Sequence, residues 1–429
     1  MVLLIPKISV PHRSSAALRD LPGLGDQRMV GYTPFPMKTE VEEEKNQITK
    51  HILPLAMGLA SSYTAGSAMG MLLQLYLKHL GASHILIAMG TSTRSLGSVL
   101  GGIVLGRLSD RLPHKPLLLA AMGMGAVGIA VLAFLPPASL AIGAGFLRAF
   151  AGAGLAAVAM ALISGLSSAG NRGRNLSYVT ASRSAGLMFG KLAAGALLGW
   201  LGFRGSFSIL ALLPLFGLAA LLPLPHAEIE RSHTRRAGFR LLVESGFLPL
   251  FLGALLRQMG TTGFFAFIYV YMAELGISPE TMGVLAALNH AIQVVGMLLF
   301  GRISDAVGRR AVFLTGFGLS VLVPLVFAIS RDPFGIGLGF ALLGIAFSSL
   351  YIGSTAHLGD RVPIERQGEI LGLFDSSRAL GGMLGPLLSG ILAEPFGLRG
   401  AFLAMAGVSA LGFTSVLFCR GPRGAARSV

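Results

Sequence analysis

Charged residues are scarce in this sequence, and acidic residues are the scarcest of them. Of 429 residues only 12% are charged, with 19 Asp and Glu against 34 Lys and Arg. An average soluble domain carries about 25% charged residues. The 53% share of hydrophobic residues would leave a soluble protein with more apolar surface than it could bury. The composition therefore excludes an ordinary soluble domain and indicates an integral membrane protein.

Cysteine and nucleotide-binding patterns are almost missing too. The single cysteine, Cys419, excludes an internal disulfide and leaves no cysteine cluster for a metal. Residues 123–128 fit Gly-x-Gly-x-x-Gly, but they lie inside an apolar run with no strand before them, so a nucleotide site is not expected there. The sequence has no P-loop, which disfavours transport driven by ATP. We predict that the chain is not an enzyme and uses neither a cofactor nor a metal.

Long apolar runs are what the sequence has in abundance. A segment that crosses a bilayer needs about 20 mostly apolar residues. It must be a helix, because lipid offers no partner to backbone polar groups. Each such run therefore predicts a transmembrane helix. Twelve windows qualify, at approximately 53–77, 84–106, 116–136, 139–166, 174–200, 204–224, 247–273, 280–301, 311–330, 333–357, 368–393 and 399–419.

The two halves of the chain match each other at a constant offset of 195 residues. Residues 106–110 (Gly-Arg-Leu-Ser-Asp) return as 301–305 (Gly-Arg-Ile-Ser-Asp), and residues 202–207 return in similar form as 397–402. Gene duplication explains a constant offset, and parallel repeats place a ligand site at the seam between the halves. We predict an all-α integral membrane protein, with twelve transmembrane helices as two six-helix pseudo-symmetric bundles around a central cavity.

The domains expected from this repeat are a polar, disordered N-terminal tail, a first bundle, a basic cytoplasmic linker, a second bundle and a short cytoplasmic tail. In that order they cover residues 1–50, 51–224, 225–246, 247–420 and 421–429. No cleavable signal peptide is expected at the start. Both Met1 and Met37 remain open as the first residue of translation.

Basic residues predict the orientation. The net charge of +15 could indicate nucleic-acid binding, but Lys and Arg lie mostly in short gaps between apolar runs. If the N-terminus is inside, the loops on the opposite side carry only Lys78, Arg204, Arg331 and Arg399, and cytoplasmic loops are the ones rich in basic residues. We predict a monomeric, multi-pass protein of the cytoplasmic (plasma) membrane with both termini in the cytoplasm and no nucleic-acid partner.

The most specific motif lies between the second and third predicted helices. Residues 106–115 resemble Gly-x-Leu-x-Asp-Arg-x-Gly-Arg-Lys, the signature of the major facilitator superfamily, with Pro113 and His114 where Gly and Arg are usual. A second copy, at 301–310, lies between the second and third helices of the second half. The sequence is therefore similar to this superfamily of secondary transporters over residues 50–420.

The resemblance implies that the two loops act as gates. An acidic side chain at the end of one helix can face the positive N-terminus of a helix in the other half. Asp110 would then lie near the start of the eleventh helix, and Asp305 near the start of the fifth. The alternative is that both loops are solvated and only fix the topology. The implied gating residues are Gly106, Asp110, Arg111, Gly301, Asp305 and Arg309.

Two further segments concern the branch of the superfamily. The fourth predicted helix has Arg148 followed by Gly152, similar to the superfamily's intramembrane Arg-x-x-x-Gly segment, which is linked with proton coupling. The fifth helix carries spaced glycines that partly resemble the drug:proton antiporter branch, although Lys191 stands where that branch has Pro. Glycines that merely permit close helix contact explain the spacing equally well.

Charged residues inside predicted helices usually mark a pathway, an ion pair or a coupling site. Arginines and one histidine lie near mid-depth, Lys191 lies farther out, and Asp375 is the one acid expected to be buried among them. Arg183 and Arg378 are repeat equivalents and have a structural alternative, pairing with the Asp of the opposite signature loop. The candidates for substrate binding or coupling are Arg94, Arg148, Arg183, Arg257, His290, Asp375 and Arg378.

One carboxylate cannot neutralise this many cations if they share a cavity. An anionic substrate held by Arg side chains would supply the missing charge, whereas a cationic substrate would need a buried acid. We predict a secondary transporter that moves a small organic solute, anionic or amphipathic, by alternating access, with protons as coupling partner and export as the direction. The alternatives are uptake of a nutrient such as a carboxylate, and a non-transporting receptor or assembly protein on the same fold.

Overall fold

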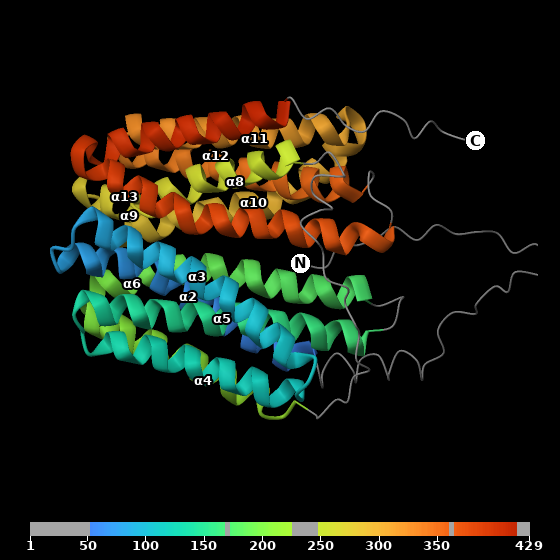
Figure 1. Cartoon of the computed structure of the whole chain (residues 1–429). Coiled ribbons are helices and arrows are strands. Elements are labelled where there is room, and N and C mark those ends of the chain that lie inside the picture. Colours follow the sequence, from blue (N-terminus) through green and yellow to red (C-terminus); the bar gives the residue numbers. More distant parts are fainter. Residues whose placement is uncertain (1–51, 168–171, 225–247, 360–363, 418–429) are drawn as a thin grey trace, which may run out of the picture. The chain divides into compact units, whose positions relative to one another are not determined.

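The computed structural model describes residues 52–167, 172–224, 248–359 and 364–417, which belong to one compact unit. Helices are the only regular secondary structure within these residues, which confirms the all-α prediction (Figure 1). The predicted N-terminal tail (1–50), linker (225–246) and C-terminal tail (421–429) lie outside the described residues.

The helices follow the predicted windows closely. In chain order they are α2 (Leu53–His79), α3 (His84–Ser109), α4 (His114–Ala133), α5 (Ala138–Leu166), α6 (Arg172–Leu221), α8 (Leu248–Phe265), α9 (Ile268–Glu274), α10 (Pro279–Val307), α11 (Arg309–Ile329), α12 (Pro333–Gly359) and α13 (Ile364–Leu417).

Two helices are long enough to cross a bilayer twice, and each is divided by a glycine. α6 has 50 residues and α13 has 54, about 75 and 81 Å at 1.5 Å per residue, against a hydrocarbon core of about 30 Å. Gly202 in α6 and Gly397 in α13 have φ of 64° and 68°, a left-handed conformation that costs other residues about 1–2 kcal/mol. The two glycines are repeat equivalents, and each falls between two predicted windows.

The window 247–273 differs from its prediction, because the structure divides it into α8 and α9. The Phe267 backbone N–H bonds to the carbonyl of Phe264, a tighter turn than an α-helix makes. The carbonyl oxygen of Phe265 accepts a bond from Gln74 Nε2 of α2 at 3.1 Å. A tertiary hydrogen bond therefore accompanies the break, and the two residues at the break, Ala266 and Phe267, are neither Gly nor Pro.

Repeat-equivalent residues also start two helices. The Ser83 hydroxyl accepts a bond from the Leu86 N–H at the start of α3, and Ser278 accepts one from the Thr281 N–H at the start of α10. Such N-caps satisfy backbone donors that the first turn leaves unpaired. The duplication thus preserves local structure as well as sequence.

Eight helical segments of the described chain are apolar and long enough to cross a membrane: His114–Ala133, Ala138–Leu166, Arg174–Leu221, Leu248–Glu274, Pro279–Val307, Arg309–Ile329, Pro333–Gly353 and Gly372–Leu417. α2 and α3 are helices of 27 and 26 residues, but they are less apolar. The reason is visible in the tertiary structure, because side chains such as Ser62, Gln74 and Arg94 face a polar cavity.

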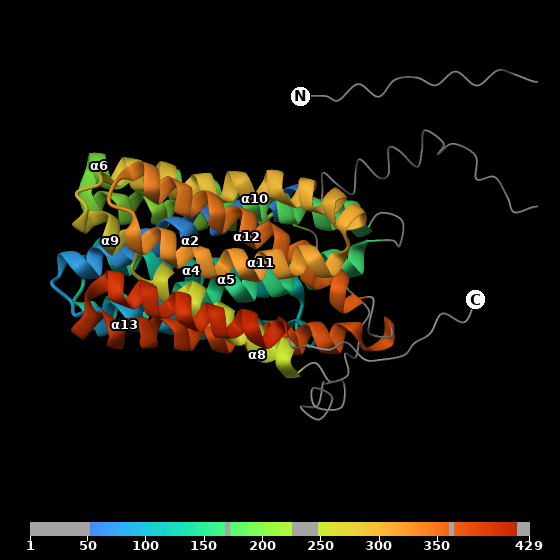
Figure 2. The ribbon, with the colours of Figure 1, turned by 90° about the horizontal axis from the view of Figure 1, so that it is seen from above.

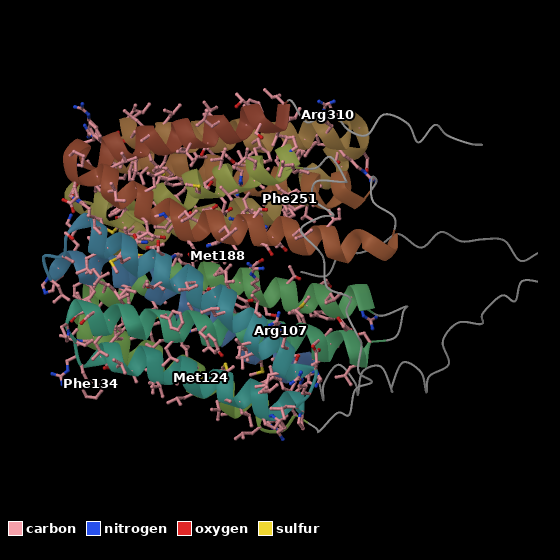
Figure 3. All side chains as sticks on the ribbon, in the orientation of Figure 1. Arg107, Met124, Phe134, Met188, Phe251 and Arg310 are labelled. Carbon is pink, nitrogen blue, oxygen red and sulfur yellow. The ribbon has the colours of Figure 1, made fainter. Side chains whose placement is uncertain are left out.

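The helices run alongside one another, and their connections gather at two ends (Figures 1 and 2). We call the first end the short-turn end, which holds the turn after α2, Phe134 after α4, and the bends at Gly202 and Gly397. We call the second end the signature-loop end, which holds the turn after α3 and Arg310 of α11. Phe134 and Arg310 mark these opposite ends in Figure 3.

Helices α2–α6 pack mainly on one another, as do α8–α13, and the two groups meet where α3 contacts α13 and α6 contacts α10. The contacts between groups are close in the half nearer the short-turn end, where Gly195 packs on Gly283 and Gly390 on Ala88. At that end two ion pairs join the groups, Lys78 to Glu274 at 3.5 Å and His84 to Glu394 at 3.7 Å. The seam is therefore closed on the short-turn side.

Within the first group, α3 approaches α5 through glycine. A β-carbon at Gly101 would overlap the carbonyl group of Phe150, whereas one at Gly102 would meet no atom within 4 Å. Overpacking of this kind costs about 1–3 kcal/mol. We expect Gly101→Ala to lower the melting temperature of the purified protein clearly and Gly102→Ala, the matched control, to leave it nearly unchanged. Equal melting temperatures for the two variants would contradict the α3–α5 packing described here.

Candidate functional site

A cavity of about 620 Å³ lies among α2, α3, α5 and α6, with Phe265 of α8 and His290 of α10 completing its lining. The closed seam between the groups bounds it toward the short-turn end. On its other side Arg183 lines the cavity and is exposed. A space of this size can hold a small organic molecule.

The lining of this cavity is cationic. Among its residues are Arg94, Arg148, Arg183, Lys191 and His290, and none of the lining residues is Asp or Glu. The charge of Arg94 is near enough to those of Arg148 and Lys191 to repel both. Four of these five residues were candidates from the sequence, and the structure brings them together.

Arg148 is held in a pocket made by glycine. It is 5% exposed, and a β-carbon at Gly66 would come within 2.9 Å of its Nη2 atom. Nη2 donates to the backbone carbonyl of Ser62 and, at 3.1 Å, to the Ser62 hydroxyl. The Nε atom is buried and has no hydrogen-bond partner. The guanidinium is therefore fixed in place but incompletely satisfied.

Arg94 of α3 occupies an environment similar to that of Arg148 of α5. A β-carbon at Gly70 would lie 2.9 Å from its Nη2 atom, and one at Gly145 would lie 3.3 Å from its Cγ. Its guanidinium therefore crosses the face of α2 and its aliphatic part lies on α5. Small residues on α2 and α5 thus make the room that both arginines need, a role that the spacing of glycines alone did not reveal.

Lys191 was counted among the charges inside the helices but was not a predicted site residue. The structure places it in the cavity, 6% exposed. Its ammonium donates to the Ser67 carbonyl at 3.0 Å and lies 4.9 Å from the centre of the Tyr269 ring. One signal was present in the sequence, because Lys191 replaces the Pro of the antiporter signature, and its repeat equivalent is Pro386.

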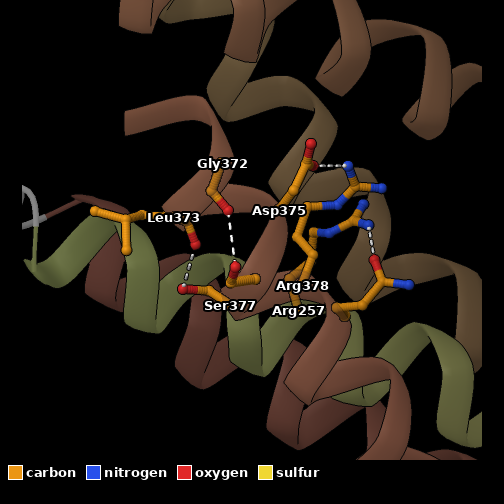
Figure 4. Close-up of polar contacts among 8 residues, drawn as sticks. Arg257, Gly372, Leu373, Asp375, Ser377 and Arg378 are labelled. Carbon is orange, nitrogen blue, oxygen red and sulfur yellow. Dashed lines mark hydrogen bonds and ion pairs between the residues drawn. The ribbon is translucent and has the colours of Figure 1, made fainter. Parts of the chain in front are cut away.

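Arg257 does not join this cavity. It is 8% exposed and lines a separate pocket of about 40 Å³ among α8, α11, α12 and α13, together with Arg378. Arg257 donates to the Gln258 amide oxygen at 2.8 Å and to the Ser320 hydroxyl at 3.4 Å. Figure 4 shows the side chains of Arg257 and Arg378 next to each other, with Asp375 bound to Arg378 at 3.1 Å. The Asp375 side chain is 70% exposed, so the expectation that Asp375 is a buried acid inside the helices is wrong.

The two buried guanidinium groups occupy equivalent places in the two repeats. Arg148 binds Ser62, and the repeat equivalent of Ser62 is Arg257 itself. Arg148 also lies against Gly125, whose equivalent is Ser320, the partner of Arg257. Each half therefore buries one guanidinium at the same point, supplied by different helices, which sequence comparison at the 195-residue offset cannot show.

The remaining candidates lie at the edges of the cavity. His290 reaches it from α10 and interacts with Gln293 on the same helix. Arg183 lies 5.6 Å from the centre of the Tyr63 ring, a distance typical of a cation–π contact. The described residues contain no group of three or more His, Cys, Asp or Glu arranged to hold a metal.

The signature loops lie at the end opposite the closed seam. Asp110 caps the end of α3, is exposed, and lies near enough to His114 to interact electrostatically; Gly106 is one turn earlier in α3 and Arg111 is exposed beyond it. In the second copy Gly301 and the exposed Asp305 lie in the last two turns of α10, and Arg309 starts α11. The side chains at the start of the eleventh predicted helix, where Asp110 is expected to bind, lie outside the described part, so the latch remains a prediction.

Comparison with known proteins gives a consistent result. The model of the Major Facilitator Superfamily matches residues 55–274 and 250–428. The multidrug resistance protein MdtG of Citrobacter koseri is 27% identical over 361 residues, 78% of this chain and 86% of that protein. The inner membrane transport protein YnfM of Escherichia coli (strain K12) is 29% identical over 148 residues, 34% of this chain and only 35% of that protein.

Solved structures share the fold. The nucleoside transporter NupG has a TM-score of 0.71 and 17% identity, with 85% of this chain and 98% of that chain covered. A bacterial homolog of the human lysosomal transporter Spinster, inward-facing and unoccupied, has a TM-score of 0.73 and 13% identity, with 87% and 98% covered. The chain belongs to the Major Facilitator Superfamily. It is a multi-pass membrane transport protein and not an enzyme.

The unequal hydrogen bonding of the two buried arginines leads to a test of their roles. A buried, incompletely paired charge destabilises the empty protein, so its removal costs little or stabilises it. We expect Arg148→Met to leave the melting temperature of the ligand-free protein unchanged or higher. Arg257→Met, which breaks bonds to Gln258 and Ser320, should lower the free energy of unfolding by about 1–3 kcal/mol. A larger loss for Arg148→Met than for Arg257→Met would show that Arg148 is the structural residue.

Proposed function

We propose that this protein is a secondary transporter that moves a small organic anion across the cytoplasmic membrane by alternating access. The observation that carries this proposal is the cavity of about 620 Å³ whose lining holds Arg94, Arg148, Arg183, Lys191 and His290 and no acidic residue. A charge buried without a partner costs several kcal/mol. The anion that fills the cavity would remove that cost.

The architecture proposed with this function is twelve transmembrane helices in two six-helix bundles, residues 51–224 and 247–420. In support, the bends at Gly202 and Gly397 divide α6 and α13 at equivalent points, and the superfamily model matches the chain twice, over residues 55–274 and 250–428. α8 and α9 together make one crossing of 27 residues. The contacts of α3 with α13 and of α6 with α10 are themselves related by the repeat, as expected for two bundles around a shared pseudo-twofold axis.

Arginine favours an anionic substrate for reasons of geometry as well as charge. Its planar guanidinium presents several donors in a fixed fork that matches a carboxylate or phosphate. Arg148 keeps a free Nε donor inside the cavity wall, while its Nη2 donors are held by Ser62. A cationic substrate would meet repulsion from every charged residue of the lining, so the cavity chemistry disfavours it.

The proposed direction is export, with protons as the coupling partner. MdtG, which matches this chain over 86% of its own length, carries the name multidrug resistance protein. That name supports export. With both termini in the cytoplasm, as the basic loops predict, the closed short-turn end faces outward and the structure corresponds to the inward-facing state. The same cavity would also suit uptake of a carboxylate, and this remains the second candidate.

The anion proposal is tested by removing one guanidinium at a time. A hydrogen bond to a charged group contributes about 1.5–3 kcal/mol, or about 10- to 150-fold in Kd. We expect Arg94→Gln and Arg148→Gln each to weaken the binding of an aromatic sulfonate or carboxylate by this amount, measured by isothermal titration calorimetry.

Arg257→Gln provides the matched control, because Arg257 is as deeply buried as Arg148 but lines a different pocket. The affinity of the Arg257→Gln protein for the same anions should stay within about twofold of the affinity of the unchanged protein. If Arg257→Gln weakened binding as strongly as Arg148→Gln, or if neither cavity variant changed the affinity, the proposed anion site would be wrong.

The signature loop is tested separately. Asp110 lies exposed at the end of α3, so Asp110→Asn should leave folding intact. If Asp110 serves as a gate latch, as family resemblance implies, transport in proteoliposomes should fall to a small fraction of the original rate, and Asp305→Asn should reduce it less. Full transport by the Asp110→Asn protein would reduce the loop to a determinant of topology.

A further inference from the structure

The closed end of the cavity holds an arrangement of polar groups that charge alone does not explain. Gln74 of α2 and Tyr269 of α9 are repeat equivalents at the 195-residue offset. Both are buried, at 4% and 0% exposed. The Gln74 Oε1 and Tyr269 hydroxyl oxygens both lack a hydrogen-bond partner. Native proteins rarely leave such groups unsatisfied, and Gln74 lines the cavity, so its Oε1 acceptor marks a place where a donor such as water binds.

Lys191 lies at the same place. Its ammonium is 4.9 Å from the centre of the Tyr269 ring and is bound to one acceptor, the Ser67 carbonyl, at 3.0 Å. A protonated lysine has three donors, so two of its N–H bonds are available toward the cavity. An oxyanion in the cavity would accept from the Lys191 ammonium.

Lys191 also differs chemically from the arginines around it. Arginine stays protonated under all ordinary conditions, whereas a lysine can gain and lose a proton. Besides Lys191 and the arginines, the titratable groups of the lining are Tyr63 and His290. No residue that lines the cavity is acidic, so near neutral pH an amine or an imidazole is the group that can carry a proton at the cavity wall.

The charged groups around Lys191 come from every side and are mostly positive. α3 contributes Arg94, α5 contributes Arg148, α10 contributes His290, and α6 itself contributes Arg183. α2 faces Lys191 with uncharged Ser67 and Gln74, α9 with Tyr269, and α4 carries His114 and Lys115 only at its signature-loop end.

The acid nearest to Lys191 along these helices is Glu280 of α10. It lies beside Gly199, eight residues or about 12 Å along α6 from Lys191. The backbone contact between Gly195 and Gly283 lies between the two positions. Glu280 is therefore outside the cavity, on the far side of the seam that closes it.

We infer that a proton and the anionic substrate bind together at Lys191, and that they do not compete. An anion among these cations stabilises the protonated form of Lys191 relative to the empty cavity, because opposite charges attract and like charges repel. By linkage, a proton on Lys191 strengthens anion binding by the same factor. The neutral amine takes its proton from bulk water, and no other bond changes.

This inference rests on the proposed anionic substrate and determines the sense of coupling. Exchange of substrate for proton requires the two to exclude each other from one site, as a cation and a proton do at a carboxylate. An anion and a proton that favour each other are carried in the same direction. A proton gradient directed inward would then drive the anion inward, so this coupling favours the second candidate, uptake of a carboxylate, over the proposed export.

The test measures protons during binding. The purified protein, in weakly buffered detergent solution with a pH indicator, is titrated with methanesulfonate, benzenesulfonate and naphthalenesulfonate, which stay ionised and so contribute no proton of their own. We expect protons to be taken up, so that the solution becomes more alkaline, and the affinity to rise by as much as about tenfold for each unit of falling pH while one proton is linked. Proton release, or no proton change on saturable binding, would overturn the inference.

Failure of the proposed function gives a different result, since none of the three sulfonates would then bind. The Lys191→Arg variant tests whether Lys191 carries the proton, because arginine keeps the positive charge but does not release its proton. This variant should bind the sulfonate with little proton uptake, and His290→Gln, the control, should keep the uptake. The reverse pattern would overturn the assignment to Lys191. If Lys191→Arg does not fold, the sign measured on the unchanged protein still decides the sense of coupling.

Discussion

The structure depends on one constraint, which is that positive charge inside a membrane protein must always have a partner. Water is excluded from the lipid-facing core, so a guanidinium that has lost its hydration needs a carbonyl, a carboxylate or a bound anion. In the α8–α13 group this need is met internally, since the buried Arg257 bonds to Gln258 and Ser320. In the cavity it is met only in part, because Arg148 keeps an unpartnered Nε.

Small residues make that arrangement possible. Helices that pack through glycine bring their backbones close together, and here the missing side chains also leave space for long ones. Arg94 lies against Gly70, and Arg148 against Gly66, so each arginine fills the room that a β-carbon would have taken. Elsewhere Gly195 packs directly on Gly283, and this contact closes the seam at the short-turn end. Cavity, closure and charge placement are therefore consequences of the same residue type.

Much of this fold could be predicted from the sequence, because the constraints that produce it are local. Bilayer thickness and hydropathy set the helix windows, and the repeat placed the bends at Gly202 and Gly397 between windows. The break between α8 and α9 could not be predicted, since it accompanies a hydrogen bond from Gln74, nearly two hundred positions earlier. Position in the sequence gave the depth of each charge but not its rotation about the helix axis. Arg257 was consequently expected beside Arg94 and Arg148, whereas it lies in another pocket, and Lys191 was given too little importance.

The central claim is that the positive charge of the cavity selects anions, and three probes of nearly equal size and shape test it most directly. Benzenesulfonate, benzenesulfonamide and phenyltrimethylammonium place a negative, a neutral and a positive group on the same ring. Calorimetric titration of the purified protein should show the sulfonate binding at least about tenfold more tightly than the sulfonamide, equivalent to about 1.4 kcal/mol, with the ammonium compound weakest. Binding of phenyltrimethylammonium as tight as, or tighter than, that of benzenesulfonate would contradict the account.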